Sequence, residues 1–465
     1  MKPVTLGQIA AWTGGTLDGS GAESCVVTRV STDSREALNG ALFVPIVGER
    51  HDAHDFLNQA FAQGAVAALC SRAGAAATGP LIRVDDTLAA LQQLAARYRE
   101  TLHPFVAVAV TGSNGKTSTK DFLTAVLSRR YEVLATKGNL NNHIGLPLTV
   151  LSVDARHTAG VFELGMNHFG EIAPLAAISR PEIGVITNIG TAHIEFLGSR
   201  EGIALEKGRL VEAIPATGCV VLNADDDMTP SLVARTRATV VTAGVSSGEV
   251  RAERIDGSAF DLVVAGAAPV RVHLPVPGRH MVGNALLAAA VGWRLGLTPG
   301  EIKAGLESAT LHGGRLQRRV CAGLAILDDS YNANPDSVRA ALRTLREEPV
   351  AGRRIAVLGR MGELGPHAAE GHRVVGHAAA DEGIDFLITV GDDDSRLIRE
   401  AFGQPERSLA CGTHAAAAAW LRDHAKPTDL ILLKGSRSAA MDKVLAALET
   451  LPEPPARPAL EAAHP

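Results

Sequence analysis

The chain has 465 residues, of which 46% are apolar and 20% are charged, and its formal net charge is −5. This length predicts about three domains. The weak negative charge gives no indication of a nucleic acid or an anionic membrane surface as a partner, so an anionic substrate would need local cations.

Cysteine usage and hydropathy narrow the class of protein further. The cysteines at 25, 70, 219, 321 and 411 form no CxxC pair, which favours reduced thiols and a cytoplasmic location over a disulfide framework or a zinc site. The apolar runs are shorter than a membrane span, and the first residues lack the pattern of a signal peptide. We therefore expect a cytoplasmic protein without membrane insertion.

Residues 1–84 are predicted to form a first, small α/β domain. Apolar runs at 42–47 and 65–70 indicate strands, and the stretch 53–63 indicates a helix. A polar cluster precedes the first strand and consists of Ser31, Thr32, Asp33, Ser34 and Arg35. By itself this cluster is typical of a solvated turn. The alternative is a loop that binds a nucleotide-like head group, with Arg35 facing a phosphate.

The segment VAVAVTGSNGKTS at 106–118 is the clearest candidate for a binding site. Its apolar start predicts a buried strand, and a helical pattern follows from 118 to 127. Gly112 and Gly115 allow a turn whose N–H groups point at an anion, and the helix dipole adds to this attraction. Lys116 can bind the outer phosphates of ATP, and the Thr117 hydroxyl can bind Mg²⁺. The predicted phosphate loop comprises Thr111, Gly112, Ser113, Asn114, Gly115, Lys116, Thr117 and Ser118.

The predicted central domain, residues 85–312, begins with a helical stretch over 85–99 and then alternates strands with helices. Strand candidates stand at 106–110, 160–164, 183–187 and 219–222, which is typical of a parallel sheet. Ligands of such sheets bind beyond the carboxyl ends of the strands, and Glu163 and His193 are placed there. Together with Thr117 they are predicted to ligate Mg²⁺, for which a carboxylate is better suited than an imidazole.

Two further segments of this domain carry amide side chains. The loop 136–145 is rich in amides and glycines. Because it follows the phosphate loop, Asn139, Asn141 and Asn142 are candidate substrate-binding residues. Asn284 ends the sequence GRHMVGN, at the start of a helix predicted to run to about residue 295; the pattern fits a plain helix start equally well.

From residue 313 the pattern restarts, which predicts a C-terminal Rossmann-like domain over 313–465. Strands are expected at 324–327, 355–358, 386–390 and 430–433, and helices at 336–346, 367–381, 395–401 and 438–448. Polar residues again follow the strands, at 328–335, 359, 391–392 and 434–437. Lys434 is either an anion-binding residue or an ordinary loop lysine. From residue 452 the tail, rich in Pro and Ala, is predicted to be disordered.

These segments together resemble the Mur ligase family, whose members build the peptide stem of peptidoglycan. The resemblance covers nearly the whole chain in the expected order, and it rests on STDSR, LFVPIVGERHDAHDF, TGSNGKTSTK, GNLNNHIGLP, ELGMNHFGEIA, TNIGTAHIEFLGS, GRHMVGNALLAAA, DDSYNANPDS, GRMGELG and KGSRSAAM. One departure is His143, which stands where the family often has Asp. Folylpolyglutamate synthase, a relative, shares the phosphate loop but lacks the UDP-type first domain and the YNAN stretch. A motor or switch ATPase would not account for two further domains with polar strand ends.

The resemblance implies a three-domain amide ligase that uses ATP and Mg²⁺. The stretch at 329–334, DSYNAN, resembles the member that joins D-alanyl-D-alanine to UDP-N-acetylmuramoyl-tripeptide through an acyl phosphate. The residues from Ser31 to Arg35 would hold the uridine nucleotide. The amides Asn139, Asn141 and Asn142 would line the muramoyl group, and Lys434 is the remaining candidate substrate contact. A monomer is expected.

The resemblance also implies which residues carry the chemistry. Lys116 would bind the β- and γ-phosphates, with Arg315 nearest the γ-phosphate. His193 would join Thr117 and Glu163 on magnesium. Lys207 matches the position where family members carry a carbamylated lysine, which would be a further metal ligand. The remaining implied nucleotide contacts are Asn284, Asp329 and Asn332.

Overall fold

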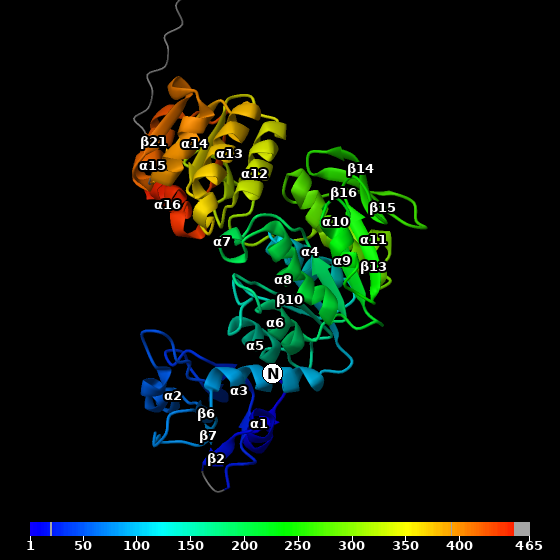
Figure 1. The fold of residues 1–465 in the computed structure, drawn as a ribbon, viewed down its shortest axis with the longest axis vertical. Helices are drawn as coiled ribbons and strands as arrows, with labels where there is room; N and C mark the ends of the chain where they lie inside the picture. Colours follow the sequence, from blue (N-terminus) through cyan, green and yellow to red (C-terminus); the bar gives the residue numbers. More distant parts are fainter. Residues whose placement is uncertain (19–20, 392, 451–465) are drawn as a thin grey trace, which may run out of the picture.

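The computed structural model describes residues 1–18, 21–391 and 393–450. Figure 1 shows its three α/β regions in chain order from bottom to top, coloured from blue through green to red. Each region is built around a mainly parallel sheet of its own, which confirms the predicted α/β fold class. Within the described residues no helix is long and apolar enough to cross a membrane. Position 392 and the tail from 452 lie outside the described residues, and the boundaries at 84 and 312 stay predictions.

The N-terminal region contains a sheet with the strand order β2-β7-β6-β5-β4. Its strands are β2 (Thr16–Asp18), β4 (Arg29–Ser31), β5 (Ala41–Phe43), β6 (Ala67–Cys70) and β7 (Leu81–Arg83). The short antiparallel pair β1 (Val4–Thr5) and β3 (Val26–Val27) and helix α1 (Leu6–Thr13) belong to the same region. The predicted helix at 53–63 is divided into a 3₁₀ turn, η1 (Ala53–Phe56), and α2 (Leu57–Ala62). The Asp52 carboxylate accepts from the His54 N–H and caps the tighter turn.

The central region is built on a sheet whose order, within the described chain, is β16-β15-β14-β13-β12-β11-β8-β10-β9. The four predicted strands are confirmed as β8 (Val106–Thr111), β10 (Ala159–Glu163), β11 (Ile183–Ile186) and β12 (Cys219–Asn223). The strands that were not predicted are β9 (Val133–Ala135), β13 (Thr239–Gly244), β14 (Val250–Asp256), β15 (Ala259–Val264) and β16 (Val270–His273). The last three add an antiparallel edge. Strand β14, VRAERID, was missed because it carries charges, is partly exposed and has no apolar run.

Strand β8 lies inside the sheet between β10 and β11, and this position explains its apolar sequence. Val108 and Val110 pack into a core on one face, whereas Ala107 and Ala109 pack into a second core on the other face. A parallel strand covered on both faces needs apolar residues at nearly every position. Polar residues begin where β8 ends, at the carboxyl edge of the sheet. There the turn 112–115 leads into helix α4 (Lys116–Leu127).

The other helices of the first two regions surround these sheets. They are α3 (Thr87–Glu100), α5 (Gly145–Leu151), α6 (Ile172–Ser179), α7 (Ile194–Leu197), α8 (Arg200–Ala213), α9 (Thr229–Val233), α10 (Arg279–Arg294) and α11 (Pro299–Glu307). Helices α10 and α11 both pack against α4. The helix predicted to run to about residue 295 is thus confirmed as α10.

The C-terminal region contains a sheet of the order β17-β18-β22-β19-β20-β21. The predicted strands are confirmed as β18 (Leu324–Asp329), β19 (Arg354–Gly359), β20 (Phe386–Val390) and β22 (Leu430–Lys434), and the missed ones are β17 (Gln317–Cys321) and β21 (Ser408–Cys411). The helices are α12 (Pro335–Glu347), α13 (Ala368–Asp381), α14 (Asp393–Phe402), α15 (His414–His424) and α16 (Asp442–Thr450). The start predicted for the last helix, residue 438, is wrong. A 3₁₀ turn, η4 (Arg437–Ala439), and the left-handed backbone of Ala440 (φ 49°) precede α16.

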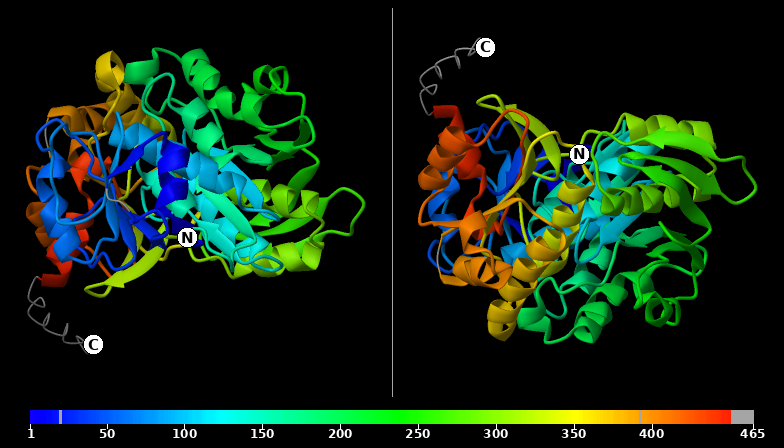
Figure 2. Two further views of the ribbon diagram at one scale, coloured as in Figure 1. Left: turned by 90° about the horizontal axis from the view of Figure 1, so that it is seen from below. Right: turned by 90° about the horizontal axis from the view of Figure 1, so that it is seen from above.

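The three regions leave one side of the central region facing both of its neighbours. Viewed along the long axis in Figure 2, the blue N-terminal and the orange to red C-terminal regions lie on the same side, and the green strands project to the other. Polar ends of strands from the central and C-terminal sheets therefore meet between the regions, where the site described next is found.

Candidate functional site

A cavity of about 1680 Å³ runs between the regions and is lined mainly by polar side chains and loops. Gln92 of α3 and the asparagine loop (residues 139–143) line one end of it. The phosphate loop lies in its wall, and residues of α12 and η4 line the opposite side. A ligand in this cavity can therefore contact the central and C-terminal sheets at once.

Both glycines of the phosphate loop have positive φ values, which agrees with the predicted turn. The N–H groups of Ser113 and Asn114 donate to Asn188 at 2.9 Å, so an arrangement of N–H groups that points at an anion stays a prediction. Gly115 has φ +79°, and a Cβ atom on it would lie 2.4 Å from Asn284 Oδ1. Gly112, at φ +154°, would place a Cβ atom 1.8 Å from Thr187 Oγ1. These two positions tolerate no side chain, because neighbouring residues press directly on the backbone. Asn284 of α10 is thus brought against the phosphate loop, and its implied contact with a nucleotide stays a prediction.

Two cations converge on the start of α4. Lys116 Nζ donates to the carbonyl of Gly112 at 2.8 Å, which holds the ammonium over the loop. Burial lowers the pKa of Lys116, and the nearby Glu163 carboxylate opposes that effect. Arg315 donates to Thr117 Oγ1 at 3.0 Å, and its guanidinium lies 4.0 Å from the centre of the Tyr331 ring. Residues 198 positions apart in the chain therefore meet at the start of α4.

A carboxylate and an imidazole face these cations. The buried Glu163 side chain, at the end of β10, accepts from Asn141 Nδ2 through Oε1 at 2.9 Å, whereas its Oε2 has no hydrogen-bond partner among the described residues. His193 Nδ1 lies 2.7 Å from Glu363 Oε2, in a contact with the distance of an ion pair but without the direction of a hydrogen bond. Burial lowers the pKa of His193, and Glu363 opposes that effect.

These donors suit a magnesium ion that is completed by phosphate oxygens. The free oxygen of Glu163 and the Thr117 hydroxyl are hard oxygen ligands, which Mg²⁺ prefers. Within the described residues no three His, Cys, Asp or Glu side chains are grouped as a metal site. Mg²⁺ in nucleotide sites is commonly held by one or two carboxylates together with substrate phosphates, so the residues present fit such an ion.

Lys207 is fully enclosed in the protein. It lies on α8 with 1% of its surface exposed, and it does not line the cavity. Burial lowers its pKa well below the usual value, and the charge of Lys116 acts in the same direction. A lysine in this environment favours the neutral amine, which is the form that can react with CO₂ to give a carbamate.

The predicted substrate-binding asparagines of the asparagine loop lie in the cavity wall, but their side chains make different hydrogen bonds. Asn139, Asn141 and Asn142 all line the cavity. Asn142 Oδ1 accepts from the N–H groups of Ile144 and Gly145, so this side chain also caps the start of α5. Asn141 orients Glu163 as described above. The side chains of Asn141 and Asn142 thus already make hydrogen bonds within the protein.

In the C-terminal region the predicted residues contact one another. Lys434 Nζ lies 2.5 Å from Asp329 Oδ2 and 3.0 Å from the carbonyl of Asn332. Burial raises the pKa of Asp329, and Lys434 opposes that effect. Asn332 Oδ1 accepts from the backbone N–H of Arg437. Lys434 lines the cavity but is engaged by two protein partners, so its contact with substrate stays a prediction.

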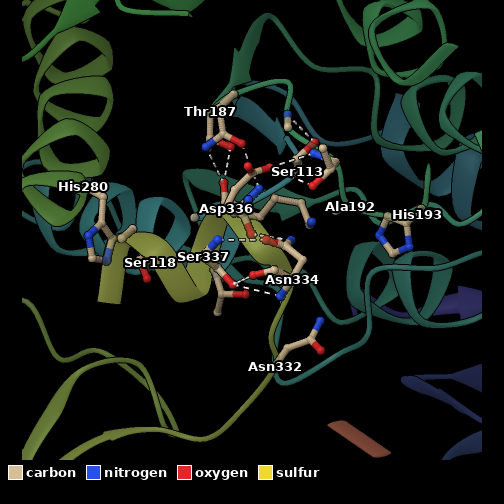
Figure 3. Close-up of a pocket in the computed structure, with 18 of the residues that line it drawn as sticks. Ser113, Ser118, Thr187, Ala192, His193, His280, Asn332, Asn334, Asp336 and Ser337 are labelled. Atoms are coloured by element: carbon tan, nitrogen blue, oxygen red, sulfur yellow. Dashed lines mark hydrogen bonds between the residues drawn. The ribbon is translucent and has the colours of Figure 1, made fainter. Parts of the chain in front are cut away.

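The structure adds three residues that the sequence analysis did not assign to the site. Asn334 Nδ2 donates to Asn114 Oδ1 at 2.8 Å, and Asp336 Oδ2 accepts from both the N–H and the hydroxyl of Thr191 at 2.9 Å. Figure 3 shows these side chains at the start of α12, facing the phosphate loop. Glu363, beside His193, is the third. Asn334 and Asp336 fit the pattern of a helix N-terminus, which hid their contacts with the central region.

The polar cluster of the N-terminal region lies outside the cavity. Arg35 donates through two nitrogens to the carboxylate of Asp33, at 2.8 and 2.7 Å, and this pairing lowers the pKa of Asp33 to about 2. Ser31 and Ser34 are buried, and Ser31 contacts Glu36. The structure therefore shows an ordered turn at the end of β4, with the Arg35 side chain 84% exposed.

Family models match all three regions. The model "Mur ligase family, catalytic domain" matches residues 26–99, "Mur ligase middle domain" matches residues 110–292, and "Mur ligase, glutamate ligase domain" matches residues 314–437. The matches cover well over half of the chain.

The chain belongs to the Mur ligase family. This Mur ligase is 39% identical, over 97% of its length and 99% of the relative's, to the UDP-N-acetylmuramoyl-tripeptide–D-alanyl-D-alanine ligase of Escherichia coli. Among solved structures, it is similar to MurF from Acinetobacter baumannii, with a TM-score of 0.90, 34% identity and coverage of 97% and 99% of the two chains. It is also similar to the MurF ligase from Thermotoga maritima in complex with ADP, with a TM-score of 0.82, 28% identity and coverage of 90% and 97%.

Proposed function

We propose that this Mur ligase joins D-alanyl-D-alanine to UDP-N-acetylmuramoyl-tripeptide at the expense of ATP, forming ADP and phosphate in peptidoglycan precursor synthesis. The observation that carries the proposal is the full-length similarity to ligases named for this reaction. The site agrees with it, because a phosphate loop, a free carboxylate oxygen and two cations line one wall of a cavity that reaches the C-terminal region.

ATP and Mg²⁺ are part of the proposal. The loop from Thr111 to Ser118 would hold the phosphates, with Asn284, Asp329 and Asn332 near the rest of the nucleotide. The T. maritima neighbour is described in complex with ADP, which supports a nucleotide at this loop. Thr117 and Glu163 would hold the metal, with His193 and a carbamylated Lys207 as further ligands. Bound there, Mg²⁺ would neutralise charge on the phosphates.

The residues of the site suit activation of a carboxylate. An oxygen of the tripeptide carboxylate attacks the γ-phosphorus, the bond to the bridging oxygen breaks, and ADP leaves. The amine of the dipeptide then attacks the acyl carbon, the C–O bond breaks, phosphate leaves, and the amine loses a proton. The first step brings two anions together. Lys116 and Arg315 offset their repulsion and stabilise charge on the transferred group.

The remaining contacts are proposed for the substrates. The turn from Ser31 to Arg35 would hold the uridine nucleotide, with the exposed guanidinium of Arg35 available to a phosphate. Asn139, Asn141 and Asn142 would line the muramoyl group, and Lys434 would reach substrate or position the loop 329–332. We also propose a cytoplasmic monomer. The free cysteines are consistent with a reducing compartment.

The proposal is tested by mass spectrometry of the products formed from a panel of UDP-muramoyl-peptides with ATP and D-alanyl-D-alanine. The expected result is an amide-linked pentapeptide product, with phosphate released only when both substrates are present. Vigorous turnover of ATP alone would favour a motor or switch ATPase. Glutamate addition to a folate, with no muramoyl product, would favour folylpolyglutamate synthase.

A further inference from the structure

Two adjacent buried charges on the phosphate-loop helix have no part in the chemistry above. Lys120 and Asp121 of α4 are 4% and 5% exposed, and their charged groups lie 3.3 Å apart. Buried charges are costly unless other groups pair with them, and these two make further contacts in opposite directions.

Lys120 contacts the substrate side of the site. Its Nζ donates to the carbonyl of Thr136 at 2.9 Å, immediately before the asparagine loop. The hydroxyl of Thr136 accepts from the backbone N–H of Glu163 at 3.0 Å. One buried ammonium is therefore two contacts away from the backbone of Glu163, the residue whose carboxylate faces Lys116. Asn141, in the asparagine loop, donates to the Glu163 carboxylate itself.

Asp121 contacts the linker to the C-terminal region. Its Oδ2 accepts from the backbone N–H of His312 at 3.0 Å, and its Oδ1 lies 3.3 Å from His312 Nδ1. Gly313 and Gly314 follow with φ of +51° and +58°, and then comes Arg315, which donates to Thr117. The linker is thus fastened to α4 on both sides of its two glycines.

Helical spacing explains why one helix can serve both sides. Residues four apart lie on the same face of a helix, one turn above the other. Lys120 therefore lies one turn below Lys116, on the side of Glu163. Asp121 lies one turn below Thr117, on the side of Arg315. Lys120 therefore lies where it can reach the segment that contacts Glu163. Asp121 lies where it can reach the linker that carries Arg315.

We propose that Lys120 and Asp121 are positioning residues for the ligase reaction: Lys120 places Glu163 through Thr136, and Asp121 places Arg315 through the linker at His312. This inference rests on the proposed function. It means that α4 sets the separation between the carboxylate and the guanidinium on opposite sides of the transferred phosphate. Errors of about 1 Å in such positions lower rates by about 100-fold.

The test is a pair of double-mutant cycles on the full-length chain, with product formation measured at saturating substrates. Asp121→Ala is combined with Arg315→Ala, and Lys120→Met with Glu163→Gln. Each positioning variant is expected to lower kcat about 10- to 100-fold alone, with KM for ATP changed less than about 3-fold. When Arg315 or Glu163 has already been replaced, the additional change of Asp121 or Lys120 is expected to lower kcat by less than about 2-fold. The reason is that the effects of two residues are not additive when one acts through the other.

Further variants complete the design. Asp121→Asn keeps an oxygen for the His312 N–H and is expected to retain most of kcat. The matched controls Asp442→Ala and Lys443→Met change an adjacent, exposed pair at the start of α16 and are expected to leave kcat unchanged. If Asp121→Ala does not fold, as judged by its unfolding midpoint, Asp121→Ser replaces it in the cycle.

The outcomes distinguish failure of the positioning roles from failure of the proposed function. Absence of the amide product with the wild-type chain would refute the proposed function itself. If the wild-type chain is active and the fold-losses of kcat in the single variants multiply in the double variants, the positioning roles are wrong and the proposed function stands. Loss of kcat in Asp121→Asn equal to that in Asp121→Ala would also contradict the contact with the linker.

Discussion

At the scale of single residues, the site depends on charges that the protein holds close together. Lys116 and Arg315 are cations at one end of α4, and Glu163 faces them with one carboxylate oxygen free of hydrogen bonds among the described residues. Charges in a partly buried site interact more strongly than charges in open water, because the effective dielectric constant is lower. Each of these residues therefore has an effect that can be measured by removing one charge.

The first prediction concerns Lys116. Lys116→Ala is expected to lower kcat by about 10²–10³, because one preorganised donor to the transferred phosphate is lost. Steady-state phosphate release in the presence of both substrates measures the effect. Lys443→Ala, at an exposed position of α16, is the matched control. Full turnover in the Lys116 variant would remove the basis of the proposed reaction.

Lys207 provides a second prediction. Its environment favours the neutral amine, so carbonate-dependent carbamylation is expected, and Lys207→Ala should abolish most activity. Added acetate or formate should restore part of it, because a small carboxylate can occupy the space of the lost carbamate. A ¹³C signal from labelled CO₂ on the wild-type protein, absent in the variant, gives a readout that does not depend on turnover. Activity of the alanine variant equal to wild type would contradict the role.

A third prediction separates pairing from substrate binding at Lys434. Lys434→Met leaves the Asp329 carboxylate buried and unpaired, which is expected to destabilise the C-terminal region by about 3–5 kcal/mol. The double variant Asp329→Asn, Lys434→Met removes both charges and should recover much of that stability. Urea unfolding measures both variants. Equal destabilisation in the single and the double variant would show that the ion pair is not the cause.

At the scale of elements, the start of α12 joins two regions. Asn334 caps its own helix through Oδ1, which accepts from Ser337 N–H, while its amide nitrogen donates to Asn114. Asp336 accepts twice from Thr191, in the loop that leads to His193. The start of α12 therefore contacts both the phosphate loop and the loop that leads to His193, and so fixes the positions of these two loops relative to the C-terminal sheet.

The fourth prediction tests this contact. Asp336→Ala removes two hydrogen bonds to a charged acceptor and is expected to lower kcat about 10-fold or more, since each such bond contributes about 1.5–3 kcal/mol. The unfolding midpoint should change little, because the contact lies between regions and outside their cores. Arg346→Ala, on the exposed side of the same helix, serves as the control. If both variants keep wild-type turnover, the contact has no role in the reaction.

At the scale of the whole molecule, the reaction requires that the regions exclude water. An acyl phosphate is hydrolysed if water reaches it, so closure around the cavity should precede chemistry. The glycines at 313 and 314, both with positive φ, lie in the linker where such motion is expected. The contacts of Asn334, Asp336 and Glu363 already join the C-terminal region to the central one in this structure.

The fifth prediction is therefore a change of shape. Small-angle scattering should show a smaller radius of gyration when a non-hydrolysable ATP analogue and the muramoyl substrate are both bound, compared with the free chain. Gly314→Ala should impair this compaction, because the residue has φ +58° and its Cβ would lie 3.0 Å from Ser330 Oγ. An unchanged radius in the wild-type chain would exclude closure as a step.

Features that depend on neighbouring residues could be predicted from the order of the amino acids. The phosphate loop could be predicted because its strand, glycines, lysine and helix follow one another within 13 residues, and the apolar strands of both large sheets show as short runs. Only the folded structure showed which distant groups meet: the pairing of Lys434 with Asp329 and the contacts of Asn334 and Asp336 across regions. Local patterns record the periodicity of an element and its burial, but a hydrogen bond between residues 100 or more positions apart depends on how the elements pack, so those contacts became visible only in the folded chain.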